Sequence, residues 1–261
     1  MPAPESESAP ASASASASAS ASESAPLTVA VAQPVCAESG RPDTVVLNVE
    51  RHAATVREAG TRLVVFPEFS LTGYDLDAPA LAPGDPRLAP LVAACAETGS
   101  VALVGAPVAD RDGLEYIGTL AVSGRGVEVA CRKTHLHGQE VERFAPAGTP
   151  SVLELDGFRL GLAVCADVAE PGHAERTAGL GIDAYVGSAL YGVSESQLAR
   201  RDSHMRERAT AHGVWGVLST GAGASGDFAE TSGGSGVWAA DGSLVVQAGD
   251  GAGEIIRVEL R

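Results

Sequence analysis

The run Arg159-Leu-Gly-Leu-Ala-Val-Cys165-Ala-Asp167 constrains the fold more than any other stretch of this chain. Its apolar residues are continuous rather than alternating, which is typical of a strand that is buried on both faces. A cysteine at the end of such a strand lies on rigid backbone at the edge of a sheet, a suitable position for a nucleophile. A free cysteine is often only a small core hydrophobe. The rest of the chain separates these two interpretations.

Length and charge limit the classes of protein and partner. The chain has 261 residues with 45% hydrophobic content, enough for one large domain or two small ones. Its formal net charge of −15 argues against nucleic acids and anionic membranes as partners, because clustered Lys and Arg bind phosphate. No apolar run approaches the roughly 20 residues of a membrane span. The four cysteines include no CxxC pair, which indicates free thiols in a reducing compartment, so we expect a cytoplasmic protein.

Residues 1–25 have a different composition from the rest. Ala and Ser alternate from Ala11 to Ser22, and the segment contains no Lys or Arg for the basic region of a signal peptide. Such a repeat buries too little apolar surface to offset the entropy of ordering its backbone. We therefore predict a disordered tail over residues 1–25 and one domain over residues 26–261.

The domain begins with a strand–helix–strand pattern. Leu27–Gln33 predicts a strand, Asp43 is placed to cap a helix that ends at Gly60, and Arg62–Phe66 predicts a second, buried strand. This order favours a parallel pair of strands. The helix is expected to bury Val45, Val46, Val49 and Val56. Further helices are predicted at 86–96, 171–180 and 195–211, and further strands at 101–105, 116–122, 126–131, 152–155, 158–164, 184–187, 214–219, 237–239, 244–247 and 254–260. The pattern indicates an α/β fold.

Two more chemical groups follow predicted strands. Glu68 lies between Pro67 and Phe69, and a carboxylate packed against apolar neighbours has a raised pKa, as a general base needs. Lys133 lies two residues after Cys131, where the predicted strand ends, and a solvated lysine is the ordinary case at a strand end. With Cys165, these make three groups at strand ends.

Two weaker patterns do not support a cofactor or a metal. Gly221–Gly226 matches GxGxxG, but no helical pattern follows it, so we interpret it as a flexible loop. His135 and His137 could suggest a metal pair, but neither HExxH nor a carboxylate cluster accompanies them. Ordinary polar side chains are the simpler interpretation, and we expect no metal.

Four blocks occur in order along the chain. They are Val64–Glu68 with Leu71–Tyr74; Arg132–Leu136 followed by Glu140 and Phe144; Gly161–Asp167; and Gly233–Ser235. From Leu27 to the C-terminus the chain resembles the nitrilase superfamily, the carbon-nitrogen hydrolases. The resemblance implies a four-layer α-β-β-α sandwich and a homodimer or larger homo-oligomer.

The resemblance also implies roles for individual residues. Glu68 is the general base, Lys133 and the Ala166 N–H stabilise an oxyanion, Cys165 is the nucleophile, and Glu140 orients Lys133. Tyr191 and His137 could line the substrate pocket. A lysine ammonium near the thiol would stabilise a thiolate. No metal or organic cofactor is needed for this chemistry.

The expected activity is hydrolysis of a small linear amide or N-carbamoyl compound through a cysteine thioester. One alternative is a nitrilase, although Ala166-Asp167 replaces the Trp-Glu usual in that branch. Another is an acyltransferase, which needs a site for a second substrate. A catalytically silent scaffold on the same fold is the alternative from another class. Its support is the altered block Arg208-Ala-Thr-Ala-His212, which in the family usually ends in Glu-Asn.

Overall fold

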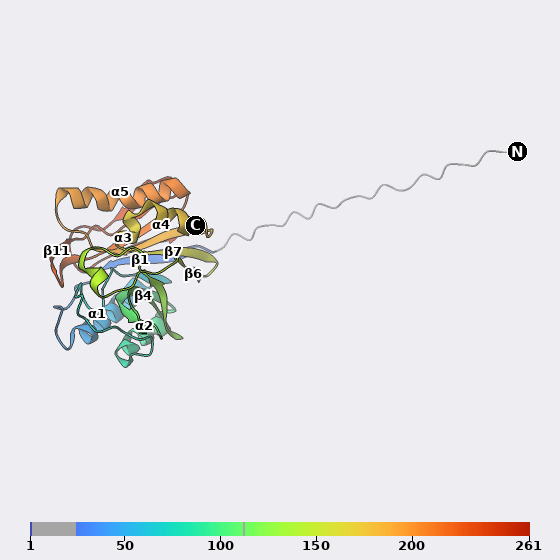
Figure 1. Cartoon of the computed structure of the whole chain (residues 1–261). Coiled ribbons are helices and arrows are strands. Elements are labelled where there is room, and N and C mark those ends of the chain that lie inside the picture. Colours follow the sequence, from blue (N-terminus) through green and yellow to red (C-terminus); the bar gives the residue numbers. More distant parts are fainter. Residues whose placement is uncertain (2–24, 112) are drawn as a thin grey trace.

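Two six-stranded sheets face each other, and helices cover the outer face of each (Figure 1). The computed structural model describes Met1, residues 25–111 and residues 113–261. This α-β-β-α arrangement confirms the fold class predicted from the sequence. The predicted disordered tail lies, at residues 2–24, outside the described residues. Within the described ranges, no helix is long and apolar enough to cross a membrane.

The first sheet has the order β14-β1-β2-β3-β4-β5. Strands β1, β2 and β3 are parallel, as the strand–helix–strand pattern predicts. Two helices, α1 and α2, cover its outer face (Figure 1). The elements are β1 (Leu27–Gln33), α1 (Thr44–Ala59), β2 (Leu63–Val65), the 3-10 turn η1 (Pro86–Leu88), α2 (Ala89–Thr98), β3 (Val101–Ala109), β4 (Glu115–Ser123), β5 (Gly126–Arg132) and β14 (Glu254–Leu260).

The second sheet has the order β13-β12-β9-β8-β7-β6, and its strands β7, β8 and β9 are parallel. Helices α3, α4 and α5 lie on its outer side (Figure 1). The elements are β6 (Ser151–Leu155), β7 (Phe158–Val164), α3 (Ala166–Ala169), α4 (Pro171–Ala178), β8 (Ala184–Ala189), α5 (Glu195–His212), β9 (Trp215–Thr220), β12 (Gly236–Trp238) and β13 (Leu244–Gln247). A separate two-stranded sheet joins β10 (Ala222–Ser225) to β11 (Phe228–Ser232).

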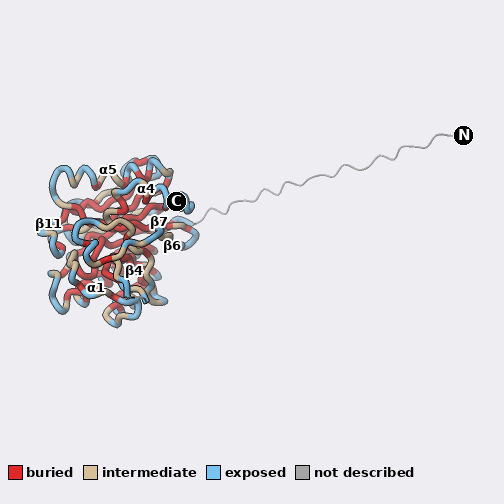
Figure 2. The backbone as a smooth tube through the Cα atoms, in the orientation of Figure 1, coloured by how far each residue is buried: buried red, intermediate tan, exposed pale blue. Residues whose placement is uncertain are grey.

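The sandwich explains why the central strands are apolar throughout. In β1, Val29 and Val31 contribute to the core between the sheets, whereas Ala30 and Ala32 contribute to the core under α1 and α2. Successive side chains of a strand point to opposite faces, so each face of this strand meets an apolar layer. Figure 2 shows buried residues concentrated in the interior of the sandwich and exposed residues along α5 and the surface loops.

The start of α1 departs from its predicted pattern. Val45, Val49 and Val56 are buried as expected, but Val46 is 39% exposed. The prediction for Val46 was wrong because it lies about 100° around the helix from Val45, outside the buried stripe. Asp43 occupies the N-cap position without capping: its carboxylate accepts a hydrogen bond from Nε of Arg41 instead.

The glycine-rich segment is also different from the prediction. Residues 222–225 form strand β10, which pairs with β11, rather than a flexible loop. Gly226 has a φ of 55°, and a Cβ there would lie 1.9 Å from the carbonyl oxygen of Tyr74. The glycine therefore allows the hairpin to approach the loop that carries Tyr74. No helix follows it, which agrees with the rejection of a dinucleotide fingerprint.

Candidate active site

Glu68, Lys133 and Glu140 meet in a buried ionic cluster. Lys133 lies directly after β5, Glu68 lies in the loop after β2, and Glu140 lies in the 3-10 turn η2 (Gly138–Glu142). Nζ of Lys133 lies 2.8 Å from Oε1 of Glu68 and 2.7 Å from Oε1 of Glu140. The side chains of Lys133 and Glu68 are fully buried. The family resemblance predicted that Glu140 lies at Lys133, and the structure brings these two residues and Glu68 together.

Lys133 keeps its charge in this cluster. Burial by itself lowers the pKa of the ammonium group, but the neighbouring carboxylates, above all Glu68, outweigh burial and raise it. Two carboxylates share one ammonium group, so the second negative charge is poorly compensated. Burial raises the pKa of Glu68, and repulsion from Glu140 adds to this effect, whereas Lys133 opposes it. The net result is a raised pKa, as expected for a general base.

The second carboxylate oxygen of Glu68 is available for chemistry. Oε2 is buried and has no hydrogen-bond partner among the described residues. A buried carboxylate oxygen without a partner carries a desolvation cost, so such an oxygen calls for an explanation. The thiol of Cys165 is a neighbour, because Glu68 and Cys165 each shift the pKa of the other. Glu68 is thus placed to exchange a proton near the sulfur.

Cys165 lies at a strained turn between β7 and α3. Its φ of 47° and ψ of −100° place a non-glycine residue in a region that costs about 1–3 kcal/mol. Two hydrogen bonds hold the turn: the Cys165 N–H donates to the Ser188 carbonyl and the Val168 N–H donates to the Cys165 carbonyl, both at 2.9 Å. Ala166 begins α3, so its N–H has no acceptor within that helix. An N–H of this kind beside the sulfur can bind a developing oxyanion.

The resting form of Cys165 is the thiol. Burial raises the pKa of the thiol to about 12, and the negative charge of Glu68 adds to this, while Lys133 lowers it. Lys133 favours the thiolate, as the sequence predicts, but burial and Glu68 raise the pKa of the thiol by more than Lys133 lowers it. A protonated nucleophile needs a base at the moment of attack, which is consistent with Glu68 beside it.

A model of the family described as carbon-nitrogen hydrolase matches residues 28–261. The chain belongs to the carbon-nitrogen hydrolase family. A hydrolase encoded in the pqqF 5' region of Pseudomonas protegens is 31% identical over 147 residues, which cover 53% of this chain and 52% of that protein. An (R)-stereoselective amidase of a Pseudomonas species is 28% identical over 154 residues, covering 57% and 56%. The chain thus spans about half the length of the curated relatives it matches.

Solved structures of nitrilase-superfamily proteins share this fold. Nit3 of Saccharomyces cerevisiae, a member of branch 10 of the superfamily, superposes with a TM-score of 0.77 at 22% identity, covering 90% of each chain. A mutant amidase of Nesterenkonia sp. AN1 in complex with butyramide gives a TM-score of 0.77 at 22% identity, again covering 90% of each chain. At these identities the structures establish the fold of this carbon-nitrogen hydrolase.

Tyr74 extends the ionic cluster of this carbon-nitrogen hydrolase. Its hydroxyl donates to Oε1 of Glu140 at 2.9 Å, and the backbone N–H of His137 donates to Oε2 at 2.8 Å. Glu140 is therefore held from three sides, counting Lys133, which fixes the position of the ammonium group. Tyr74 belongs to the block Leu71–Tyr74, but its contact with Glu140 was not predicted from the sequence. Its position six residues after Glu68 was the available signal.

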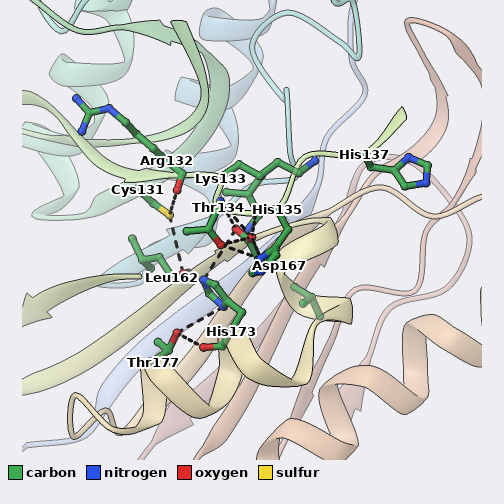
Figure 3. Close-up of polar contacts among 12 residues, drawn as sticks. Cys131, Arg132, Lys133, Thr134, His135, His137, Leu162, Asp167, His173 and Thr177 are labelled. Atoms are coloured by element: carbon green, nitrogen blue, oxygen red, sulfur yellow. Dashed lines mark hydrogen bonds and ion pairs between the residues drawn. The ribbon is translucent and has the colours of Figure 1, made fainter. Parts of the chain in front are cut away.

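The two predicted pocket residues have different surroundings. Tyr191 is buried just beyond β8, and its pKa is raised by burial and by its neighbour Cys165. His137 is exposed and lines a hollow of about 210 Å³ together with Tyr74 and Phe228. Its ring projects away from the cluster of polar contacts around Asp167 (Figure 3). Tyr191 is thus near the sulfur, whereas His137 lies at an opening on the Tyr74 side.

Arg208 is the first residue of the altered block at the end of α5, and it contacts α3, the short helix that follows Cys165. Arg208 donates from Nε to the Val168 carbonyl at 3.3 Å and from Nη2 to the Ala169 carbonyl at 3.0 Å. Its guanidinium therefore interacts with the C-terminal end of α3, where a cation is favourable. Ala211 is exposed and His212 is half-buried at the end of the helix. Ala211 and His212, which replace the usual Glu-Asn pair, thus lie apart from the contact that Arg208 makes.

The late glycine-serine block joins the two sheets. The Ser235 N–H donates to Oε1 of Gln33 in β1 at 2.7 Å, and the Thr220 N–H donates to Oγ of Ser235 at 2.9 Å. A Cβ at Gly234, whose φ is 75°, would lie 2.1 Å from the guanidinium of Arg201. The block thus has a structural role between β1 and β9.

No group of three or more His, Cys, Asp or Glu in the described ranges is arranged to hold a metal ion. The two histidines that could suggest a metal pair point in different directions. His135 contacts Asp167, while the ring of His137 projects away from Asp167 (Figure 3).

Proposed function

We propose that this protein hydrolyses a small linear amide or N-carbamoyl compound through a thioester on Cys165, releasing ammonia or an amine. The observation that carries the proposal is the buried Glu68–Lys133 pair beside a strained cysteine turn. The (R)-stereoselective amidase among the relatives supports an amide rather than another carbon-nitrogen bond. A homodimeric, cytoplasmic enzyme that needs no cofactor remains our prediction.

In the first half-reaction, Glu68 takes the proton of the thiol as the sulfur attacks the carbonyl carbon. The carbonyl oxygen becomes an oxyanion, which Lys133 Nζ and the Ala166 N–H stabilise. One such donor typically contributes about 3–4 kcal/mol to the transition state. Glu68 then gives its proton to the leaving nitrogen as the carbon-nitrogen bond breaks. The raised pKa of Glu68 suits both transfers, because a group that must accept and return a proton works best near the ambient pH.

In the second half-reaction, Glu68 takes a proton from water and the hydroxide attacks the thioester carbon. The carbon-sulfur bond breaks, the sulfur recovers the proton from Glu68, and the acid leaves. Glu140 holds Lys133 through both steps, because its carboxylate is itself fixed by Tyr74 and His137. Glu68, Lys133 and Cys165 thus act together, and Glu140 positions the lysine.

Ammonia release from a panel of short amides, N-carbamoyl compounds and nitriles tests the proposal. We expect release from an amide or N-carbamoyl compound by the wild type and by Cys36→Ala, a matched control that changes another half-buried cysteine. Cys165→Ala should release none. Turnover confined to nitriles would favour a nitrilase. If the wild type releases no ammonia from any compound of the panel and Cys165 does not react with iodoacetamide, a catalytically silent scaffold would be favoured.

A further inference from the structure

Asp167 is a buried carboxylate two residues after Cys165, and its strongest contacts are with the lysine loop. Its side chain is fully buried. Oδ1 accepts hydrogen bonds from Oγ1 of Thr134 at 2.6 Å and from the His135 N–H at 2.8 Å. Nδ1 of His135 lies 2.9 Å from the same oxygen, and the Thr134 N–H lies 3.1 Å from it (Figure 3). Thr134 and His135 directly follow Lys133.

The same carboxylate is anchored to the nucleophile strand. Oδ2 accepts from the Val164 N–H at 3.2 Å, at the last residue of β7. Lys133 follows β5, which belongs to the first sheet, and Cys165 follows β7, which belongs to the second. Asp167 therefore joins two loops that come from different sheets of the sandwich. The relative position of the ammonium group and the sulfur depends on such a connection.

An aspartate suits this position because the backbone groups that bind its side chain are donors. The N–H groups of Val164, Thr134 and His135 converge on its two oxygens. An asparagine would turn an NH₂ group toward some of these donors and leave them unpaired. The geometry therefore requires an acceptor at both oxygens.

We propose that Asp167 is a positioning residue that fixes the distance between the Cys165 sulfur and Lys133, and that the side chain of His135 helps to hold Asp167 in place. The inference rests on the proposed function of Cys165 and Lys133. A misplacement of about 1 Å caused by a change outside the reacting groups can lower a rate about 100-fold. Loss of this connection therefore slows the chemical step, while substrate binding, which uses other surfaces of the pocket, changes little.

His135 offers the sharpest variants, because its side chain is 34% exposed and substitution there does not open the core. His135→Leu removes the side-chain contact with Asp167 and leaves the backbone N–H in place, whereas His135→Asn keeps an N–H donor close to the position of Nδ1. Asp167→Asn disrupts the whole connection. Asp183→Asn is the matched control: it is an exposed aspartate that accepts the Arg159 N–H at 2.7 Å, ahead of β8 at the far end of the parallel strands.

Two readouts on the full chain test the proposal: kcat and KM on the responsive amide, and the rate of Cys165 alkylation by iodoacetamide followed by peptide mass spectrometry. We expect kcat to fall about 100-fold in Asp167→Asn and about 10-fold in His135→Leu, with KM changed less than about threefold. His135→Asn should recover most of the rate, and Asp183→Asn should match the wild type.

The alkylation rate separates positioning from a plain charge effect. Removing a negative charge near the thiol would by itself favour the thiolate and speed alkylation. Displacement of Lys133 from the sulfur would slow it. Faster alkylation in Asp167→Asn, or unchanged kcat and alkylation in both Asp167→Asn and His135→Leu, would overturn the proposal. If Asp167→Asn does not fold, the two His135 variants decide.

The two hypotheses fail in different ways. A wild type that releases no ammonia overturns the proposed function, yet the alkylation rates of the variants still test the connection between Asp167 and the sulfur. A wild type with Cys165-dependent turnover that survives in both Asp167→Asn and His135→Leu overturns the positioning role alone.

Discussion

Nζ of Lys133 lies 2.8 Å from Oε1 of Glu68, and neither side chain is exposed to solvent. A buried pair of this kind would be neutral overall, but Glu140 adds a second carboxylate 2.7 Å from the same nitrogen. The cluster therefore has one negative charge in excess when all three groups are ionised. Burial raises the pKa of Glu68, and the excess negative charge from Glu140 adds to this effect, whereas Lys133 opposes it. A raised pKa is the property that the proposed general base needs.

Glu68→Gln should abolish turnover while the fold remains intact. The amide preserves the shape of the side chain but cannot accept a proton, and general-base catalysis typically contributes about 100-fold to 10,000-fold. Steady-state kcat and a thermal melt provide the test. Glu128→Gln is a suitable control, because Glu128 is an exposed carboxylate in β5, the strand that leads to Lys133. Near-normal kcat in Glu68→Gln would exclude this residue as the base.

Lys133→Met should lower both activity and stability. The variant leaves Glu68 and Glu140 buried without their cation, and removal of one partner from a buried ion pair typically costs about 3–5 kcal/mol. Adding Glu140→Gln to Lys133→Met removes one of the stranded charges, so the double variant should recover stability but not turnover. Urea unfolding and kcat of the three proteins provide the measurement. If Lys133→Met retains wild-type kcat, the lysine has no role in binding the oxyanion.

The sequence predicted the strands of the sandwich well, because their residues face apolar layers on both sides. Leu27–Gln33 and Phe158–Val164 have the bounds expected from their apolar runs. Short elements were missed: α3 has four residues, too few to show a helical period. Strand β10 was missed because Gly223 and the alanines beside it have low strand propensity and because its conformation depends on β11 and Tyr74.

In the candidate site, too, local sequence predicted some features, while others depend on tertiary contacts. Residue type and position after a strand singled out Glu68, Lys133 and Cys165, and the structure places all three together. The roles of Tyr74 and Asp167 depend on contacts over 66 and 33 residues of sequence, respectively, which no local pattern encodes. The pKa of the thiol likewise depends on how fully the surrounding chain buries it.

Tyr74→Phe tests whether Glu140 needs its hydroxyl partner. The variant removes one hydrogen bond of 2.9 Å to a carboxylate and keeps the ring, which packs edge-on against Phe228 with 4.9 Å between ring centroids. A hydrogen bond to a charged group typically contributes about 1.5–3 kcal/mol. We expect kcat to fall about 10-fold, with a smaller effect than that of Glu140→Ala measured in parallel. Equal kcat in Tyr74→Phe and the wild type would show that Lys133 and the His137 N–H suffice to hold Glu140.

His52 should make the protein less stable in acid. Its ring stacks on Phe66 at 4.1 Å between centroids, and burial lowers the pKa of the imidazole from 6.5 to about 3. The unfolded chain therefore binds a proton below about pH 6.5 that the folded chain does not bind until about pH 3. The contribution of His52 to stability is complete above pH 6.5 and is lost as the pH falls toward 3.

The loss between pH 6.5 and pH 5 should be about 2 kcal/mol, since each pH unit is worth about 1.4 kcal/mol for one proton. His52→Phe keeps an aromatic ring against Phe66 but cannot take a proton, so its stability should fall less over this interval. Free energies of unfolding from urea titrations at pH 7.5 and pH 5, for the variant and the wild type, provide the test. The control is His212→Phe, at a half-buried position at the end of α5, where the wild-type decrease should persist. Equal decreases in His52→Phe and the wild type would assign the acid sensitivity to other groups.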